Sequence, residues 1–276
     1  MAQILDGKVV RDKIADSLKS EISKLDQKPQ LVIFQVGDLP ESNAYVGQKT
    51  KFGQKIGAIV KHKRLPEKIS QPELIGQIEV DNNRPDVHGI IVQLPIPNRL
   101  DKNAVIEAIN PQKDVDGQTS KNIKLLFEGL SGFVPATTKG ILTLLDWYKI
   151  PVSGKHIVVV GRSSLVGKPT ALAFLNRDAT VTVCHSKTKN LATITKTADI
   201  LISAVGKINL ITKNHVGKNQ VVIDVGINAA DKKLKGDVNF GEVKKIVGAI
   251  SPVPGGAGPM TVASLFQNLL DACTRK

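Results

Sequence analysis

Short apolar runs alternate with stretches of helical periodicity along most of the chain. Near the N-terminus, apolar residues recur at the spacing of one helix face: Val10, Ile14, Leu18, Ile22 and Leu25. The mostly apolar run Leu31–Val36 then predicts a buried strand. Further helices are predicted at 41–56 and 72–82, and further strands at 58–62 and 87–94. This order predicts a mainly parallel sheet covered by helices.

A second block of the same kind begins near Pro135, where Thr137 is a candidate cap for a helix that runs to about Tyr148. Four evenly separated strands are predicted, with helical segments between most of them, at 156–160, 180–184, 200–204 and 221–225. A terminal helix is predicted over 261–273. The block is typical of a doubly wound nucleotide-binding unit.

Length and composition narrow the class of protein. A chain of 276 residues suits two domains, and 41% hydrophobic residues with 23% charged residues are ordinary for a globular protein. No run approaches the length of a membrane span, and the first eleven residues lack the apolar core of a signal peptide, so we predict a cytoplasmic protein without a membrane partner. Cys184 and Cys273 have no motif spacing, which predicts reduced thiols and no metal site.

A net charge of +13 raises the possibility of a nucleic-acid partner. Nearly all of the 38 basic residues are lysines, and aromatic residues make up only 4% of the chain. Bidentate recognition favours arginine and stacking on single strands needs aromatic rings, so the composition argues against nucleic acid. A solvated lysine-rich surface is the simpler interpretation, and it also suits anionic small molecules.

The segment His156–Pro169 places a buried strand, a turn and the start of a helix in succession. Gly161 and Gly167 would let the backbone approach a pyrophosphate, which the unpaired N–H groups of the helix N-terminus would bind. Alternatively, the two glycines belong to a strand–turn–helix corner that binds no ligand. Ala204–Lys207 and Ile223–Asn228 also end strands with glycine, where either a ligand or a tight turn explains the residue.

The end of the second strand of this block favours NADP over NAD. An NAD enzyme carries a carboxylate there for the ribose hydroxyls, whereas residues 184–188 contain no acid. Arg162, Ser186 and Lys187 would instead surround a 2′-phosphate. Lys187 is equally interpreted as one solvated lysine among many.

The first block carries polar residues that the fold does not require. Tyr45 and Lys49 stand four residues apart on one helix face, where a partly apolar cleft would lower the lysine pKa. Surface packing is the commoner reason for such a pair. Gln93 follows a buried strand, and Asp114 and Asp116 lie in a loop, either as turn formers or as a carboxylate for the N–H groups of a heterocycle.

In order along the chain, these residues form S-x-x-Y-x-x-x-K, G-I-x-V-Q-L-P-x-P, K-D-V-D-G, G-R-S-x-x-V-G-x-P, V-I-D-V-G-I-N and P-V-P-G-G-x-G-P-M-T. Together they resemble the bifunctional methylenetetrahydrofolate dehydrogenase/cyclohydrolase family from end to end. The resemblance implies oxidation of 5,10-methylenetetrahydrofolate with NADP⁺ and hydrolysis of the methenyl product to 10-formyltetrahydrofolate. It also implies a homodimer with a role in purine biosynthesis.

The resemblance assigns roles to residues. Lys49 matches the catalytic lysine, Tyr45 a tyrosine beside the folate, Gln93 a glutamine that orients the lysine, and Asp116 the carboxylate that holds the pterin. The implied substrate-binding residues are Tyr45, Lys49, Gln93, Leu94, Asp116, Pro254, Gly255 and Gly256. The implied NADP-binding residues are Gly161, Arg162, Ser163, Ser186 and Ile227.

The expected fold is α/β, with an N-terminal α/β substrate domain, a Rossmann-like NADP-binding domain built on a parallel sheet, and an active-site cleft between them. We expect the substrate domain at 1–117, with helix 259–276 packed back on it, and the NADP-binding domain at 118–258. The chain departs from the family pattern at Gln118, Lys124, Ala136 and Thr138, around the predicted domain crossing. The main alternative is another two-domain dehydrogenase of the shikimate type, which leaves Tyr45 and Lys49 unexplained.

Overall fold

The computed structural model describes residues 2–230 and 233–275 and divides into two compact units. The three-stranded unit comprises Asp12–Ala136 and Val262–Lys276, and the six-stranded unit comprises Met1–Arg11 and Thr137–Thr261. These bounds differ from the predicted functional ranges, because the first eleven residues belong with the six-stranded unit and residues 118–136 with the three-stranded one. The assignment of functional domains to 1–117 and 118–258 stays a prediction.

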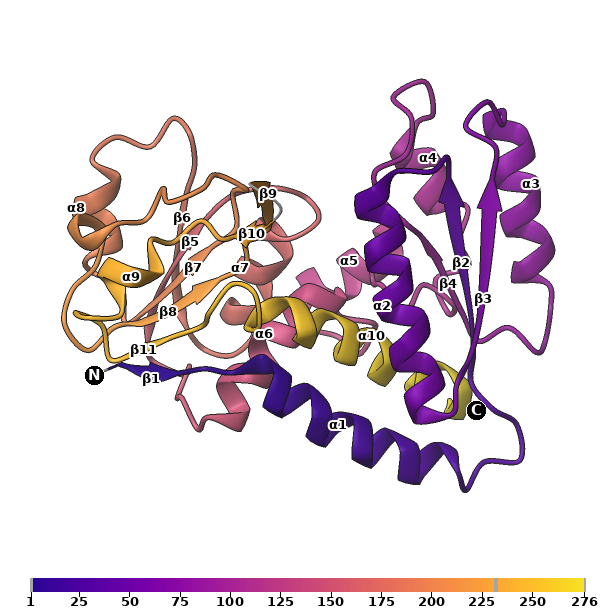
Figure 1. The fold of residues 1–276 in the computed structure, drawn as a ribbon, viewed down its shortest axis with the longest axis horizontal. Coiled ribbons are helices and arrows are strands. Elements are labelled where there is room, and N and C mark those ends of the chain that lie inside the picture. The colour runs from indigo at the N-terminus through magenta and orange to yellow at the C-terminus, as the bar shows by residue number, and fades with distance from the viewer. Residues whose placement is uncertain (1, 231–232, 276) are drawn as a thin grey trace. The chain divides into compact units, whose positions relative to one another are not determined.

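The three-stranded unit is built around β2 (Gln30–Val36), whose residues are all buried. β2 pairs in parallel with β3 (Ile59–Leu65) on one side and β4 (Gly89–Val92) on the other. Its alternate residues enter two different cores, as the two-residue period of a strand requires. One core includes side chains of α2 and α10 and the other includes side chains of α3, so helices cover both faces of the sheet (Figure 1).

The six-stranded sheet has the order β1-β11-β8-β7-β5-β6, and all its pairs are parallel. Its strands are β1 (Gln3–Ile4), β5 (His156–Val160), β6 (Thr180–Cys184), β7 (Ile200–Ser203), β8 (Val221–Asp224) and β11 (Ala249–Ile250). From β5 the chain goes to β6 on one side and then to β7 on the other. The strand order therefore reverses between β5 and β7, and ligands bind beyond the carboxyl ends of strands at such a point.

The remaining elements complete the two units. The helices are α1 (Gly7–Ile22), α2 (Pro40–Ile56), α3 (Gln71–Asn82), α4 (Lys102–Glu107), α5 (Ser120–Phe127), α6 (Ala136–Trp147), α7 (Gly167–Leu175), α8 (Leu191–Thr195), α9 (Phe240–Val243) and α10 (Ala257–Thr274). A 3₁₀ turn, η1, spans Lys213–His215, and β9 (Asn228–Ala230) pairs with β10 (Lys233–Lys235) in an antiparallel ladder. Among the described residues, none of these helices has the length and apolar character to span a membrane.

The predicted α/β class with a parallel sheet is confirmed, and the structure corrects several details. β3 continues to Leu65, beyond the predicted end at residue 62, because it pairs with β2 over its whole length. Its polar residues are tolerated because it is an edge strand. Thr137 does not cap α6: the helix already begins at Ala136, and the Thr137 hydroxyl accepts a hydrogen bond from Thr261 at 3.3 Å.

Candidate functional site

In the three-stranded unit, α2 and the end of β4 bring Lys49 and Gln93 together. Pro40 opens α2 and Gly57 ends it with a left-handed φ of 85°, so Lys49 lies well inside a regular helix. Gln93 is the first residue after β4, and its backbone N–H donates to the Phe34 carbonyl at 2.8 Å. Lys49 Nζ donates to Gln93 Oε1 at 2.8 Å although the two residues are 44 positions apart.

Gln93 is itself oriented by the chain that follows it. Its Nε2 donates to the carbonyl of Leu94 at 2.7 Å, which fixes the side-chain amide with its oxygen toward Lys49. Gln93 is buried, so water has little access to its side-chain amide. The orientation leaves the ammonium of Lys49 two further hydrogens for other acceptors.

The two acids of the K-D-V-D-G loop have different environments. Asp114 is buried, and its carboxylate accepts hydrogen bonds from the N–H groups of Gln118 and Thr119, the Thr119 hydroxyl and the Asn122 amide. Asp116 is partly buried, and no residue in the described part of the chain donates a hydrogen bond to its carboxylate. Asp114 therefore holds the loop together, while the carboxylate oxygens of Asp116 stay open among the described residues.

Lys49 and Asp116 influence each other through their charges. Burial lowers the pKa of the Lys49 ammonium, and the negative charge of Asp116 raises it part of the way back. Burial raises the pKa of the Asp116 carboxyl to about 6, against the lowering effect of Lys49. Both pKa values are thus shifted toward neutral pH. A group whose pKa lies near the working pH is the most effective at transferring protons.

Tyr45 lies one helical turn before Lys49 and is also partly buried. Burial, with a smaller contribution from the charge of Glu41, raises the pKa of its phenol. Tyr45 therefore stays protonated at neutral pH, and it presents an aromatic surface on the same helix face as Lys49. An aromatic ring at this position suits packing against a flat heterocyclic or aromatic ligand.

In the six-stranded unit, the turn after β5 has no room for side chains at its two glycines. Gly161 has a φ of 129°, and a Cβ on it would lie 2.3 Å from the carbonyl oxygen of Ala204. A Cβ on Gly167 would lie 2.2 Å from the carbonyl oxygen of Gly161. The glycines therefore let the turn pack closely against the loop after β7 and leave bare backbone at the point where the strand order reverses.

The Ser163 side chain accepts hydrogen bonds from two backbone N–H groups at the start of α7. Its hydroxyl accepts from the N–H of Val166 at 3.2 Å and from that of Gly167 at 3.3 Å. These two groups were expected to be unpaired and available to a pyrophosphate. The hydroxyl instead stabilises the turn before α7.

Arg162 and Ser186 lie at equivalent positions beyond the ends of the neighbouring strands β5 and β6. Val160 pairs with Cys184, and each predicted cofactor residue follows its strand end by two positions. Both side chains are exposed, and the turn 185–188 after β6 contains no carboxylate. A guanidinium and a hydroxyl that follow the ends of paired strands, with no acid in the second turn, fit a phosphate group.

The loop at 252–256 is fixed from within the six-stranded unit. The N–H of Gly7 donates to the Gly255 carbonyl at 2.8 Å, and the N–H of Gly256 donates to the Pro252 carbonyl at 2.7 Å. A Cβ on Gly7 would lie 2.0 Å from the Gly256 carbonyl oxygen. Sequence reasoning did not single out Gly7, because its partner loop lies almost 250 residues away.

Of two further predicted residues, Pro254 lies in this loop and Ile227 lies near the helix that follows it. Pro254 follows a cis peptide bond, as Pro95 does after Leu94. The exposed side chain of Ile227 extends toward Gly258, where an ideal Cβ would lie 3.8 Å from Ile227 Cδ1. The structure therefore places the predicted cofactor residue Ile227 close to the first turn of α10, which directly follows the loop at 252–256.

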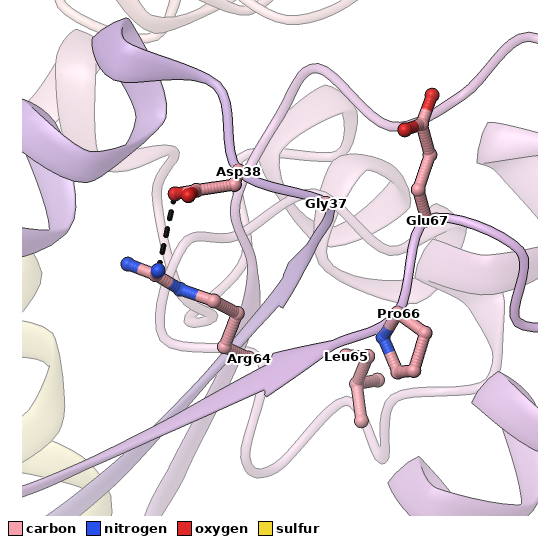
Figure 2. Close-up of a pocket in the computed structure, with 6 residues that line it drawn as sticks. All are labelled: Gly37, Asp38, Arg64, Leu65, Pro66 and Glu67. Carbon is pink, nitrogen blue, oxygen red and sulfur yellow. Dashed lines mark ion pairs between the residues drawn. The ribbon is translucent and has the colours of Figure 1, made fainter.

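A surface hollow of about 350 Å³ lies at the carboxyl ends of β2 and β3 (Figure 2). It is lined by Gly37, Asp38, Arg64, Leu65, Pro66 and Glu67. Asp38 and Arg64 point toward each other and form an ion pair at 3.1 Å, while Glu67 points away. Two acids and one already paired base do not suit an anionic cofactor, so we assign the hollow no role in the site.

Comparison with known proteins settles the family. Residues 5–116 match the catalytic domain of the tetrahydrofolate dehydrogenase/cyclohydrolase family, and residues 135–276 match its NAD(P)-binding domain. The chain belongs to the tetrahydrofolate dehydrogenase/cyclohydrolase family. The resemblance drawn from the motifs is thereby confirmed, and the shikimate-type alternative is set aside.

Individual members of the tetrahydrofolate dehydrogenase/cyclohydrolase family match over almost their whole length. The bifunctional protein FolD of Halalkalibacterium halodurans is 47% identical over 274 residues, which cover 98% of each chain. The crystal structure of the bifunctional enzyme FolD from Campylobacter jejuni has a TM-score of 0.97 at 42% identity and covers 99% of this chain and 98% of that one. The FolD of Trypanosoma brucei, crystallised with NADP cofactor and an inhibitor, has a TM-score of 0.95 at 34% identity and covers 98% of this chain and 97% of that one.

The predicted residues group by unit in this member of the family. Tyr45, Lys49, Gln93, Leu94 and Asp116 lie in the three-stranded unit. The predicted NADP-binding residues and Pro254–Gly256 lie in the six-stranded unit. Within the described residues, no group of three or more histidine, cysteine, aspartate or glutamate side chains is arranged to hold a metal ion.

Proposed function

We propose that the protein oxidises 5,10-methylenetetrahydrofolate to 5,10-methenyltetrahydrofolate with NADP⁺ and hydrolyses the methenyl product to 10-formyltetrahydrofolate. The observation that carries the proposal is the Lys49–Gln93 hydrogen bond of 2.8 Å beside the free carboxylate of Asp116, within the match to the catalytic domain of the family. The homodimer and the role in purine biosynthesis stay predictions from the resemblance, and the cytoplasmic location stays a prediction from the sequence.

Asp116 is proposed to hold the pterin ring of the substrate. Its carboxylate is free of protein donors among the described residues, so it offers both oxygens to the N–H groups of a heterocycle. Tyr45 would pack its ring beside the folate. With the substrate held at these two points, the reacting carbon is kept close to Lys49, and orientation supplies much of the rate.

Lys49 is proposed to transfer protons in the hydrolytic step. When water adds to the methenyl carbon, a proton leaves the water, and a ring nitrogen must gain one before the carbon–nitrogen bond breaks. Burial lowers the pKa of Lys49, so its neutral amine is accessible nearer to physiological pH than that of a surface lysine. Gln93 holds the amine in place by accepting a hydrogen bond from it.

The six-stranded unit is proposed to bind NADP⁺, which accepts a hydride from the substrate when bound. Gly161 and Gly167 provide the close backbone approach, and Arg162 with Ser186 would bind the 2′-phosphate. The absence of an acid in the turn 185–188 supports NADP over NAD, because a carboxylate would repel that phosphate. Ile227 would contact the cofactor with its exposed apolar side chain.

The test is to incubate the purified protein with 5,10-methylenetetrahydrofolate and either NADP⁺ or NAD⁺, following reduced cofactor and separating the methenyl from the 10-formyl product. We expect NADPH and 10-formyltetrahydrofolate. Folded protein that reduces neither cofactor would contradict the dehydrogenase, and methenyl product that disappears no faster than without protein would contradict the cyclohydrolase.

Lys49→Met separates the two steps. We expect a loss of cyclohydrolase activity of about a hundredfold or more, the usual range for a lost general acid or base, with a smaller loss of hydride transfer. Lys51→Met changes an exposed lysine on the same helix and serves as the matched control. Full cyclohydrolase activity in Lys49→Met would show that the assigned role is wrong.

A further inference from the structure

A buried carboxylate in the six-stranded unit holds the loop that follows β7. Asp237 is fully buried, and its Oδ1 accepts the N–H of Lys207 at 2.7 Å. Its Oδ2 accepts the N–H of Val205 at 2.8 Å and the hydroxyl of Ser203 at 3.1 Å. One side chain therefore fixes two backbone N–H groups of a four-residue loop, Ala204–Lys207, to the strand that the loop leaves.

A second buried carboxylate holds Asp237 in place. Asp224, the last residue of β8, accepts the N–H groups of Asp237 at 3.0 Å and Val238 at 2.9 Å. It also accepts the N–H of Gly226 at 3.0 Å in the loop after its own strand. The two acids thus form a relay: Asp224 fixes the backbone of Asp237, and the side chain of Asp237 fixes the loop after β7.

Glycines beside this relay make the close approach possible. A Cβ on Gly226 would lie 2.1 Å from Asp237 Oδ1, and a Cβ on Gly236 would lie 1.9 Å from Asp224 Oδ2. Neither carboxylate would keep its hydrogen bonds if these positions carried side chains. The glycines of V-I-D-V-G-I-N and of the segment 236–238 are therefore explained by the two carboxylates.

The loop that the relay fixes lies at the ligand-binding edge of the sheet. β7 is one of the two strands between which the strand order reverses, and the Ala204 carbonyl packs against Gly161 in the turn after the other, β5. Gly226 leads directly to Ile227, the residue proposed to contact the cofactor. A shift in either loop therefore changes the shape of the proposed NADP site.

We propose that Asp237 and Asp224 are positioning residues that preorganise the loops after β7 and β8 for NADP⁺ binding. The inference rests on the proposed function, because it takes NADP⁺ as the ligand of this edge. A loop held in its bound conformation loses less freedom on binding, so affinity rises without any contact between the carboxylates and the cofactor. Neither residue takes part in the hydrolytic step.

Asp237→Asn tests the inference with almost no change of shape. An amide keeps one acceptor oxygen and replaces the other with an NH₂ group, which would face an N–H donor of the loop instead of accepting from it. We expect the Kd for NADP⁺ to rise at least tenfold. We also expect the N–H groups of Val205 and Lys207 to exchange with solvent faster, while cyclohydrolase activity on added 5,10-methenyltetrahydrofolate stays within about twofold.

Asp199→Asn is the matched control. Asp199 accepts the N–H of His156 at 2.8 Å, at the amino end of β5 in the same sheet, so the same chemical change falls on the edge opposite to the proposed site. We expect its Kd for NADP⁺ to equal that of the wild type. If Asp237→Asn fails to fold, Ser203→Ala removes a single donor to Asp237, and we expect it to raise the Kd about threefold.

Two outcomes overturn the inference. An unchanged Kd for NADP⁺ together with faster exchange of the loop would show that the loop does not matter for binding. An equal loss of cofactor affinity and cyclohydrolase activity would show that the carboxylates only stabilise the fold. Failure of the proposed function is distinguishable from both, because the wild-type protein would then lack NADP⁺ reduction or hydrolysis before any variant is compared.

Discussion

At the scale of single residues, Asp114 and Asp116 are two positions apart in one loop and have different tasks. The Asp114 carboxylate is occupied by four donors from residues 118–122, whereas Asp116 stays open and interacts with the charge of Lys49. The sequence identifies both as candidate turn formers or ligands, but not which is which. Hydrogen bonds made by the following residues decide it, and one of them comes from the backbone N–H of Gln118, which does not depend on the side chain at that position.

Asp116→Asn is expected to lower the pKa of Lys49 further. The negative charge of Asp116 raises that pKa, so its removal leaves burial to act alone, and the ammonium loses its proton at a lower pH. The measurement is the pH dependence of Lys49 acetylation, read by peptide mass spectrometry. Asp38→Asn removes an exposed charge from the same unit as a control, and a pKa that rises in Asp116→Asn would contradict the electrostatic assignment.

Arg162→Ala is expected to weaken NADP⁺ binding about tenfold or more and to leave NAD⁺ binding almost unchanged. A charge-assisted contact to a phosphate contributes roughly 1.5 to 3 kcal/mol, and NAD⁺ has no 2′-phosphate with which to make it. The measurement is the Kd for each cofactor, with Lys168→Ala as a control for the loss of one exposed positive charge in the same turn region. Equal losses for both cofactors would remove the argument for a 2′-phosphate site.

At the scale of elements, α2 carries proposed site residues and packs against the core on the same face. Tyr45, Lys49 and Gly53 follow one another at four-residue intervals, so they lie along one face of the helix. At Gly53 this face meets β3 and α10: a Cβ there would lie 2.4 Å from Val60 Cγ2 and 3.0 Å from the Phe266 ring. The close packing at Gly53 sets the position from which Lys49 reaches Gln93.

Gly53→Ala is therefore expected to destabilise the protein by about 1 to 3 kcal/mol, because overpacking outweighs the better helix propensity of alanine. Gly47→Ala lies in the same helix with no atom within 4 Å of the new Cβ, and we expect it to gain up to about 1 kcal/mol. Urea unfolding measures both. Equal stabilities of the two variants would contradict the packing argument.

Three departures from the family pattern have definite surroundings at this scale. Ala136 is buried in the core that α2 and α10 share. Thr138 is fully buried, and its hydroxyl pairs with that of Thr170 at 3.0 Å, so α6 and α7 satisfy each other's polar groups. Lys124 is exposed and lies 3.8 Å from Glu128, one helical turn away. None of the three replaces a proposed catalytic group.

At the scale of the whole molecule, a net charge of +13 spreads like charges over the surface. Their mutual repulsion opposes the compact state, and dissolved salt screens it. Several acids are already paired, including Asp81 with Lys63 at 2.7 Å and Asp146 with Arg177 at 2.6 Å. The chain carries 38 lysines and arginines against 25 acids, so positive charge remains in excess after such pairing.

Raising NaCl from about 0.05 M to about 0.3 M at pH 7 is expected to raise the thermal midpoint of unfolding, because screening relieves more repulsion than it weakens attraction. The double variant Lys189→Gln with Lys218→Gln removes two exposed charges and should reduce the response. Differential scanning calorimetry measures it. A midpoint that falls with salt would show that attractive ion pairs dominate.

The sequence by itself determined the elements whose side chains have a regular environment. β5 and β6 lie at their predicted bounds. β5 is apolar and buried after His156 and is followed by Gly161, whereas β6 is an edge strand in which threonine alternates with apolar residues. Long motifs determined the family, because the order of their residues can be recognised without knowing which residues are in contact. Short elements such as α4, α5, β1 and β11 were not predicted, since each is too brief for a period to emerge.

Tertiary structure alone decided which residues meet. Lys49 and Gln93 are 44 positions apart, and Gly7 meets a loop near position 255, so no local pattern could pair them. It also decided that Asp114 is structural, that Ser163 occupies two N–H groups, and that Asp224 and Asp237 hold the loops of the other sheet. Periodicity reports the average environment of a segment, whereas a hydrogen bond depends on the position of one partner that only the folded chain supplies.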